Sequence, residues 1–545
     1  MTDQGLPEPV PSPIDTDYEL GQDNVTGSVG PIGFDIHNPV FAISGLAVVA
    51  FVFYTLALPE QAAGIFDMLF AAVTTRFDWF FLTAANIFVI FCLALIVSPW
   101  GKIRLGGPDA TPDFGYVGWF AMLFAAGMGI GLMFYGVSEP LGHFTSAFGG
   151  VTTGEDGMRT DWAPLGGAEG DAEAAMRLGM AATIFHWGLH PWAIYAVVGL
   201  ALALFSYNKG LPLTIRSAFY PLLGDRVWGW PGHVIDILAV FATLFGLATS
   251  LGFGATQANA GLNAVFGLPI GPVSEVLLIS GITAIALVSV LRGLEAGVKR
   301  LSEINMGLAI VLLLFVLLTG PMLALLTGFF DSLGAYFVYL PALSNPVGRT
   351  DTNFVQGWTA FYWAWWISWS PFVGMFIARV SRGRTVREFL ISVLLIPSLV
   401  CVLWMSVFGG AALQQVVADA YTAAQDADLP LQLFRMLDAL PLAGLTSIIG
   451  IVLVVVFFVT SSDSGSLVID TITSGGKVDS PAAQRVFWAC FEGAVAIVLL
   501  LGGGLAALQS MVISTGLPFT LVLLALCYTI VQGLRSELDA PAKLA

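Results

Sequence analysis

Residues 361–372 read FYWAWWISWSPF, a stretch that holds four tryptophans, one tyrosine and two phenylalanines. Indole faces are electron-rich and attract cations, so several of them in one membrane span can cage a ligand whose positive charge is spread over methyl groups. The stretch therefore suggests a site for a quaternary-ammonium group. An aromatic belt at the membrane interface, or plain core packing, would produce a similar composition, and this stretch alone leaves both alternatives open.

The composition of the whole chain is that of a polytopic membrane protein. Of its 545 residues, 57% are hydrophobic and 11% are charged, and the mean hydropathy is +0.84, which excludes an ordinary soluble globular protein. Apolar runs long enough to cross the hydrocarbon core predict twelve transmembrane helices. These runs lie at 40–59, 79–99, 115–138, 180–205, 233–256, 272–291, 304–326, 356–378, 386–409, 443–462, 484–507 and 511–532.

The distribution of basic residues predicts that both termini are cytoplasmic. The segments that follow the even-numbered spans hold 16 Lys and Arg residues, and the remaining segments hold five, at Arg76, Arg159, Arg177, Arg349 and Arg435. Cytoplasmic loops are the ones that retain basic residues. Because Arg76 is the first basic residue, no positively charged region precedes the first span, and a secretory signal peptide is not expected.

Acidic residues and cysteines add little about function. Residues 1–38 are rich in Pro, Gly and acidic residues and predict a mobile tail, and a second acidic group lies in the predicted external loop at 155–173. That loop could raise the local cation concentration or simply be well solvated. No nucleic-acid partner is indicated. No disulfide or redox motif is expected either, because all four cysteines lie in apolar spans, at Cys92, Cys401, Cys490 and Cys527.

Two membrane segments together suggest an ion site. The third span reads AAGMGIG at residues 125–131, and its glycines permit either an unwound helix that exposes backbone groups or a close-packed small-residue face. The tenth span reads FFVTSSDS at residues 457–464, with Thr460 and Ser461 mid-membrane beside Asp463. Such hydroxyls usually bond to their own helix. Together with the carbonyls of a broken helix, they would form the all-oxygen shell that sodium prefers.

The fourth span carries a second aromatic cluster, FHWGLHPWAIY at residues 185–195. Trp187, Trp192 and Tyr195 could form a wall that faces the tryptophans of span eight. His186 and His190 have the i, i+4 spacing of some zinc sites. A zinc site is not favoured here, because the segment lacks an HExxH motif, a carboxylate on the same face and a nearby cysteine.

In order and spacing, these stretches resemble those of the betaine/choline/carnitine transporter family, and in particular its sodium-coupled glycine betaine branch. The family implies an all-α leucine-transporter fold, with two peripheral helices followed by two inverted repeats of five, and commonly a homotrimer. Spans three and eight would then open the two repeats, where a midplane site is expected. The resemblance covers about residues 35–535 and rests on AAGMGIGLMFYGVSEPL, FHWGLHPWAIYA, FYWAWWISWSPFVGMFIARVSRGR and FFVTSSDS.

The resemblance also implies a set of site residues. The trimethylammonium group of the substrate would lie among Trp187, Trp192, Tyr195 and Trp366, with Trp369 lining the path. The carboxylate of the substrate would lie near the unwound backbone of Gly127, Met128, Gly129 and Gly131. A sodium site would use backbone carbonyls near Ala125 and Met128, the carbonyl of Phe457, and the hydroxyls of Thr460 and Ser461. Family members that couple choline uptake to protons often have Asp at the position of Gly131, so glycine favours a substrate with its own carboxylate.

The chain departs from the family at the second sodium site and at its carboxyl end. That family site uses two hydroxyl residues one turn apart in span five, together with a phenylalanine that matches Phe372. Thr243 matches the first hydroxyl residue but Leu247 replaces the second, so the site is expected to be weak or empty. Some osmotically regulated members have a long basic tail, whereas only Arg535 and Lys543 follow span twelve here, which leaves osmotic control open.

We therefore expect a secondary-active importer of a small quaternary-ammonium or sulfonium zwitterion in the inner (plasma) membrane, working by sodium symport and alternating access without a cofactor. Glycine betaine is the leading candidate substrate. The alternative substrates are dimethylsulfoniopropionate, carnitine, ectoine and choline, and the alternative mechanisms are proton coupling and exchange. A membrane-embedded enzyme lacks a catalytic constellation here, and a channel would need a continuous polar lining. The predicted division is a tail at 1–38, peripheral helices at 39–112, repeat 1 at 113–328, a connecting segment with repeat 2 at 329–533, and a cytoplasmic tail at 534–545.

Overall fold

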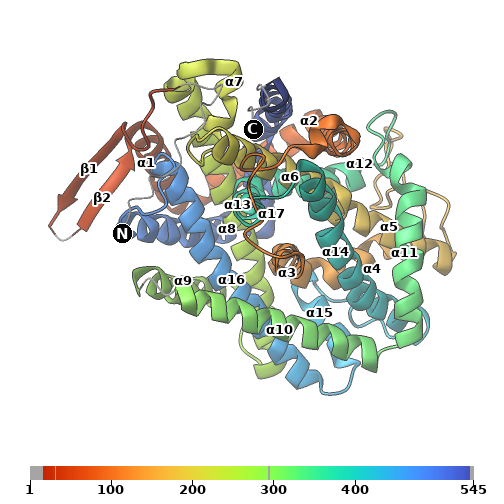
Figure 1. The fold of residues 1–545 in the computed structure, drawn as a ribbon. Coiled ribbons are helices and arrows are strands. Elements are labelled where there is room, and N and C mark those ends of the chain that lie inside the picture. Colours follow the sequence, from red (N-terminus) through yellow and green to blue (C-terminus); the bar gives the residue numbers. More distant parts are fainter. Residues whose placement is uncertain (1–15, 31, 293–294, 540–545) are drawn as a thin grey trace.

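The protein is a bundle of long helices with one β-hairpin at its periphery (Figure 1). The computed structural model describes residues 16–30, 32–292 and 295–539. The outermost parts of the predicted tails, with Asp3, Glu8, Asp15 and Lys543, lie outside these residues. The α-helices are α1 Asn38–Ala57, α2 Pro59–Val97, α3 Tyr116–Gly127, α4 Ile130–Gly149, α5 Ala172–Trp187, α6 Leu189–Ala203, α7 Tyr220–Leu223, α8 Trp230–Phe266, α9 Pro272–Arg292, α10 Glu295–Thr319, α11 Met322–Leu343, α12 Thr352–Phe354, α13 Ala360–Val380, α14 Val386–Val417, α15 Gln432–Asp438, α16 Ala443–Thr473 and α17 Ala482–Asp539. The strands are β1 Asn24–Val29 and β2 Ile32–His37, and the short turns are η1 Pro99–Lys102, η2 Leu204–Asn208, η3 Arg216–Phe219, η4 Gly224–Trp228, η5 Val355–Thr359 and η6 Leu429–Leu431.

The all-α membrane class predicted from composition is confirmed. Among the described residues, ten helices are long and apolar enough to cross a bilayer, and the bent pair α3 and α4 makes an eleventh. The expected number was twelve. The α17 helix contains the last two predicted spans, which are separated by a bend at Gly503 and Gly504. The φ of 64° at Gly504 is a conformation that glycine adopts readily. The α13 helix is also a predicted span, but it is not among the ten, because its tryptophans lower its mean hydropathy.

The segment after α10 differs from the prediction. The predicted span at 304–326 overruns its helix, because α10 ends at Thr319 and α11 begins at Met322. Gly320 and Pro321 separate the two helices, and the residue before a proline disfavours helical geometry. The α11 helix therefore occupies part of the segment that was expected to connect the two repeats, and it crosses the predicted boundary at residue 328.

The centre of the bundle is formed by α6, α8, α13 and α17. The α13 helix packs against each of the other three, and the broken span formed by α4 and α3 packs with α14 beside them. Gly199 of α6 faces Gly374 of α13, where an added Cβ on Gly374 would lie 3.0 Å from the Gly199 backbone nitrogen. Small residues at such a crossing let two membrane helices approach closely. The α9, α10 and α11 helices lie at the edge of the view and keep most of their surface exposed (Figure 1).

Hydrogen bonds sort the loops into two opposite faces. On one face, Arg104 after α2 bonds to Gly383 after α13 at 2.5 Å, and Asn208 after α6 bonds both to Arg104 at 3.0 Å and to Glu537 near the carboxyl end at 3.0 Å. The hairpin at the amino end joins this face, because the Arg216 guanidinium lies 3.1 Å from His37 Nε2. Both described ends of the chain therefore lie on the same face as the loops that follow spans two, four and eight.

A second group of loops consists of the segments after α4 and α14 and the segment before α12. Arg159 in the loop after α4 donates its backbone N–H to Thr350 before α12 at 2.8 Å, and the Thr352 hydroxyl returns a bond to the Arg159 carbonyl at 2.8 Å. Gln425 in the loop after α14 donates to Thr145 at the end of α4 at 2.7 Å. Loops after even-numbered predicted spans and loops after odd-numbered ones thus form separate groups, and which group is cytoplasmic stays a prediction.

The end of the predicted tail is structured where the model describes it. The β1 and β2 strands pair in antiparallel register, with Asn24 opposite His37. Asp35 of this hairpin pairs with Lys477 at 2.7 Å in the segment between α16 and α17. Arg216, which lies 3.1 Å from His37, is fully buried and meets Asp236 at 3.2 Å, so the described residues of the hairpin are docked rather than free.

Candidate functional site

The third predicted span is broken at its centre. The α3 helix ends at Gly127, α4 begins at Ile130, and the two axes differ by 62°. Between them Met128 has φ −94° and ψ 131°, and Gly129 has φ −172° and ψ −176°, so both residues are extended. Of the two interpretations of the AAGMGIG sequence, the structure has the broken helix.

The break leaves a helix amino terminus inside the bundle. The first hydrogen bond in α4 runs from Met133 N to the Gly129 carbonyl at 3.4 Å, so the N–H groups of residues 130–132 precede the helical ladder. These groups and the helix dipole favour an anion such as a carboxylate. The carbonyls at the end of α3 face the same break and are acceptors that suit a cation.

Four aromatic rings predicted to form the cage lie together beside this break. Trp187 at the end of α5 meets Trp366 of α13 edge to face, with ring centroids 4.9 Å apart. Tyr195 of α6 lies 6.3 Å from Trp366 and 5.3 Å from Trp192, in both cases near perpendicular. All four side chains are more than nine-tenths buried. Rings at right angles to one another present several faces to one small volume, which is the arrangement that a compact cation requires.

The glycines of the break touch the same rings. An added Cβ at Gly131 would lie 2.8 Å from Trp187 Cη2 and 3.0 Å from Trp365 Cη2. An added Cβ at Gly127 would lie 3.6 Å from Trp192 Cζ2. A residue with a side chain at position 131 therefore requires the indoles to move. The anion-favouring helix end and the aromatic cluster form one continuous site.

Other aromatic side chains extend this cluster. Trp365 stacks on Trp366 with centroids 4.8 Å apart and 14° between the planes, and Tyr135 of α4 lies 6.1 Å from Trp365. The sequence stretch around Trp366 contained Trp365, but nothing in it indicated which tryptophans share a face. Trp369 is half-buried, donates its indole N–H to the Gly246 carbonyl of α8 at 2.9 Å and packs against Phe372; its role as a path residue stays a prediction.

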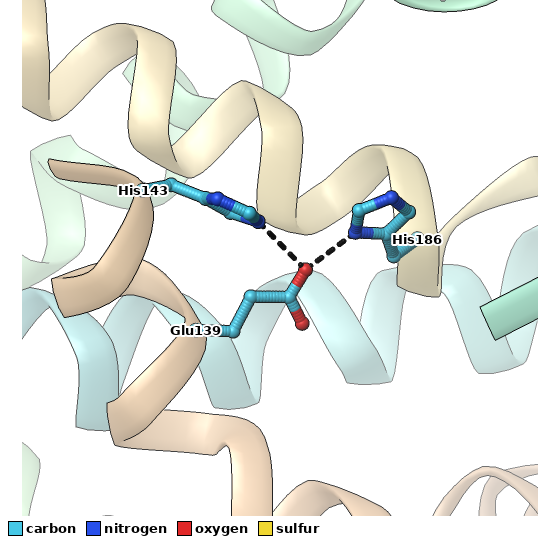
Figure 2. Close-up of side chains that lie close together, drawn as sticks. All are labelled: Glu139, His143 and His186. Atoms are coloured by element: carbon cyan, nitrogen blue, oxygen red, sulfur yellow. Dashed lines mark hydrogen bonds and ion pairs between the residues drawn. The ribbon is translucent and has the colours of Figure 1, made fainter. Parts of the chain in front are cut away.

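A buried polar cluster lies directly behind Trp187, and Figure 2 shows its three titratable members. Glu139 Oε1 lies 3.1 Å from His143 Nε2 and 2.6 Å from His186 Nδ1. Glu139 Oε2 accepts the indole N–H of Trp187 at 2.7 Å and the hydroxyl of Tyr362 at 2.6 Å. The side chains of Glu139, His143 and His186 are fully buried. The cluster therefore fixes one of the four cage rings through a charge-assisted hydrogen bond.

Glu139 and His143 were not among the residues predicted from the sequence. The signal was present, because an intramembrane carboxylate is costly and is usually functional, and because residues 139 and 143 are one helical turn apart. The two histidines that were considered as a zinc pair separate in the structure. His186 turns toward Glu139, whereas His190 bonds to Asn86 of α2 at 2.9 Å and stacks on Trp363.

The Glu139 cluster also has the donor types of a metal site. Its three candidate donor atoms lie within 4.8 Å of one another. Each oxygen of Glu139, however, already meets two hydrogen-bonding side chains within 3.1 Å. A carboxylate accepts about this number of bonds when ionised, so the geometry fits a complete hydrogen-bond network.

The predicted sodium ligands are divided between two neighbouring elements. Ala125 and Met128 lie at the break, and Phe457, Thr460 and Ser461 lie on α16, which packs against α4 and α8. The Thr460 hydroxyl bonds to the carbonyls of Val456 and Phe457 in its own helix, at 3.0 and 3.2 Å. Thr460 and Ser461 are half-buried. The sodium assignment stays a prediction.

At the predicted second sodium position, the side chain of Leu247 makes an apolar contact where a hydroxyl was expected in the family. The Thr243 hydroxyl bonds to the Ala239 carbonyl at 2.7 Å, and Phe372 packs edge to face on Trp369. Leu247 lies against Gly465 of α16, where an added Cβ would be 2.3 Å from Leu247 Cδ1. The next hydroxyls of α8 are engaged elsewhere. Thr249 donates to the Leu508 carbonyl at 3.1 Å, and Ser250 accepts the Trp365 indole N–H at 3.2 Å.

Comparison with known proteins identifies the family of this chain. The model of the betaine/carnitine/choline family transporters matches residues 39–539. A glycine betaine/proline/choline transporter of Vibrio parahaemolyticus is 65% identical over 96% of this chain and 95% of its own length. Glycine betaine transporter 1 of the same organism is 56% identical over 96% of this chain and 97% of its own length. The glycine betaine transporter OpuD of Bacillus subtilis is 44% identical over 91% of this chain and 94% of its own length. The chain belongs to the betaine/carnitine/choline transporter family.

Proposed function

We propose that this transporter imports a small zwitterion with a methylated onium group, foremost glycine betaine, in symport with sodium. One observation carries the proposal: the amino terminus of α4 at the break lies against the aromatic cluster, with Gly131 in contact range of Trp187. A carboxylate suits the helix end and a methylated cation suits the rings. A ligand with both groups would satisfy the two halves of the site together.

Several ligands share this chemistry in part. Dimethylsulfoniopropionate and carnitine have a soft methylated cation and a carboxylate, ectoine has a delocalised cation, and choline has the cation without the carboxylate. The relatives are named for glycine betaine, proline and choline, and one at 54% identity is also named for ectoine. We place glycine betaine first because it is the smallest ligand that has both charges and no group that needs a further partner.

Sodium is the proposed coupling ion. The support is an all-oxygen set of carbonyls at Ala125, Met128 and Phe457 with the hydroxyls of Thr460 and Ser461, on elements that pack together. Since Leu247 occupies the position of a hydroxyl at the second site, we expect one sodium ion rather than two for each substrate molecule. Reversal potentials in proteoliposomes would measure this ratio, and a value of two would show that other groups replace the missing ligand.

Alternating access is proposed from the same architecture. The broken span and the aromatic α13 open the two halves of the bundle and meet at the site, so relative movement of these halves would expose it to either side. We also propose a homotrimer, an inner-membrane location and a cytoplasmic position for both termini. The support for the orientation is that the described ends share one face with the loops that hold most basic residues.

The proposal is tested by uptake of labelled glycine betaine into proteoliposomes. An inward sodium gradient should drive accumulation, and equal sodium on both sides or potassium in its place should not. Unlabelled dimethylsulfoniopropionate, carnitine, ectoine, choline and proline added in turn would rank the ligands. Accumulation driven equally well by a proton gradient without sodium would contradict sodium symport. Stronger competition by another ligand would make that ligand, rather than glycine betaine, the preferred substrate.

A further inference from the structure

The buried cluster behind Trp187 has an unbalanced charge. The ion pairs of Glu139 are with His143 and His186, and no Lys or Arg among the described residues joins them. With Glu139 ionised and both imidazoles neutral, the cluster would hold a net negative charge inside the membrane. An uncompensated buried charge is costly, and one added proton makes the cluster neutral.

The hydrogen-bond partners indicate which atom takes this proton. His186 Nδ1 already faces Glu139, and its Nε2 lies 3.0 Å from the Thr359 hydroxyl. A hydroxyl can donate to a neutral imidazole or accept from a charged one, so Thr359 serves both states. His143 Nδ1 has no hydrogen-bond partner among the described residues, and a charged His143 would leave a buried N–H unpaired. The proton therefore fits on His186 Nε2.

The other titratable side chains around the cluster do not replace this role. Tyr135 of α4 and Tyr362 of α13 interact with Glu139, and His190 of α6 interacts with His186. Tyr336 of α11 lies one step further away, where its hydroxyl accepts the Leu189 N–H at 3.4 Å. The two tyrosines nearest to Glu139 are neutral hydrogen-bonding groups at ordinary pH. The charge of the cluster therefore depends on the imidazoles.

Two cage rings are tied to this cluster. Trp187 donates to Glu139 Oε2 at 2.7 Å, and Trp366 donates to the backbone carbonyl of His186 at 2.9 Å. A carboxylate at the indole N–H makes the ring more attractive to a cation on its face, whereas a charged His186 opposes that cation. A proton on His186 and an onium group in the cage therefore disfavour each other.

We propose that Glu139, His143 and His186 form a proton-binding site linked to the substrate cage. This proposal rests on the proposed function. His186 Nε2 binds one proton from solution in the empty transporter, and entry of the onium group returns that proton to solution. No covalent bond changes. Because linkage is reciprocal, substrate affinity rises with pH as the site loses its proton.

Calorimetry on the full-length protein in lipid nanodiscs tests this linkage at saturating sodium. A nanodisc separates no compartments, so no membrane potential is present. Glycine betaine is titrated between pH 5.5 and 8.5, and at each pH in two buffers of different ionisation enthalpy, which yields the number of protons released. The wild-type affinity should be about five- to tenfold lower at the acidic end, as is usual for coupling between two sites. Protons should be released on binding within the transition.

The variants identify the site. His186→Gln and Glu139→Gln should each abolish the proton release, and Glu139→Gln should also weaken binding at high pH. Thr359→Val keeps every charge but removes the partner of Nε2, so it should move the transition to lower pH, which a purely structural role would not do. His190→Gln, the matched control, should keep the wild-type transition, because His190 faces Asn86.

The outcomes separate this proposal from the proposed function. Wild-type affinity that is constant from pH 5.5 to 8.5 without proton release would overturn the proton site even if glycine betaine is bound and transported. A transition that persists in Glu139→Gln or disappears in His190→Gln would also overturn it. Failure of glycine betaine to bind the wild type at any pH would instead overturn the proposed function, and the linkage with it.

Discussion

At the scale of single residues, the site depends on which face of each indole ring is free. Trp365 stacks on one face of Trp366, and the indole N–H of Trp366 donates to the His186 carbonyl. Trp187 and Tyr195 meet the same indole near perpendicular, and the Tyr362 ring lies 5.8 Å away with 27° between the planes. Hydrogen bonds at the indole nitrogens of Trp187 and Trp366 thus orient these two rings, whose π systems would attract a cation.

Trp366→Leu should lower substrate affinity about tenfold or more. A desolvated cation over an indole gains about 0.5–2 kcal/mol, and about 1.4 kcal/mol corresponds to a factor of ten. Trp369→Leu should have a smaller effect, because Trp369 bonds to Gly246 outside the ring cluster. Trp230→Leu, at an exposed position of α8, is the control. Substrate-induced fluorescence changes would measure the affinities, and an unchanged value in Trp366→Leu would refute the cage.

Gly131→Asp should impair uptake of the zwitterion severely. The new Cβ would lie 2.8 Å from Trp187 Cη2, so the ring must move, and the added carboxylate would compete with that of the substrate at the helix end. Gly118→Asp on α3, where an added Cβ meets nothing within 4 Å, is the matched control. Competition by choline, which has no carboxylate, should be less impaired than competition by glycine betaine. Equal loss for both ligands would argue against the charge assignment.

At the scale of elements, the proposed sodium coupling rests on the broken span and α16. The α4 helix begins in the bundle interior, and α16 presents two neighbouring hydroxyls on a helix that packs against it. In the structure the Thr460 hydroxyl bonds back to its own helix, which is the usual arrangement for such a residue. That bond leaves the oxygen lone pairs able to accept a cation.

Replacing both hydroxyls, in Thr460→Ala with Ser461→Ala, should abolish sodium-driven accumulation while the protein stays folded. The proposed ion would lose two of its oxygen ligands. The Thr471→Ala variant is a control for loss of a helical hydroxyl. Thr471 lies nearer the carboxyl end of α16, and its hydroxyl donates to the Leu467 carbonyl. Sodium-dependent uptake at the wild-type level in the double variant would show that the ion binds elsewhere.

The hairpin at the amino end should loosen in acid. Burial, and then the charges of Arg216 and His233, lower the pKa of His37 to about 3. A histidine in an undocked segment titrates near about 6.5. Between these values only the undocked segment binds the proton, so docking is fully stable above about pH 6.5 and weakens as the pH falls, by up to about 1.4 kcal/mol per pH unit.

Hydrogen exchange of residues 24–37 measures this effect after correction for the intrinsic pH dependence of exchange. Protection should be lower at pH 5 than at pH 7.5, and His37→Gln should make the two values nearly equal. Protection that is the same at both pH values in the wild type would contradict the docking account.

At the scale of the whole molecule, the sequence predicted most of the fold because lipid allows few solutions. Backbone groups in a bilayer must be satisfied within helices, so long apolar runs are sufficient to place most spans. The α11 helix and the docked hairpin were not predicted, because an exposed edge helix has weak hydropathy contrast and because docking depends on distant partners such as Lys477.

The sequence indicated the four aromatic residues that lie together in the structure, but it did not indicate the buried polar cluster behind them. Tryptophans at a membrane midplane are conspicuous in a sequence, and the four cage rings do lie together. The Glu139 cluster depends on the meeting of α4, α5 and α13, which no periodicity within one segment reveals. Long-range polar pairing is decided by the packing of helices, and so it requires the three-dimensional structure.

The most direct test of the central claim is a structure with a substrate analogue in which a dimethylselenonium group replaces the trimethylammonium group and provides an anomalous signal. The account predicts the selenium peak among Trp187, Trp192, Tyr195 and Trp366, with the carboxylate at the amino terminus of α4 beside Gly129 and Gly131. A selenium peak outside these four rings, or a carboxylate on the far side of the cage from α4, would contradict it.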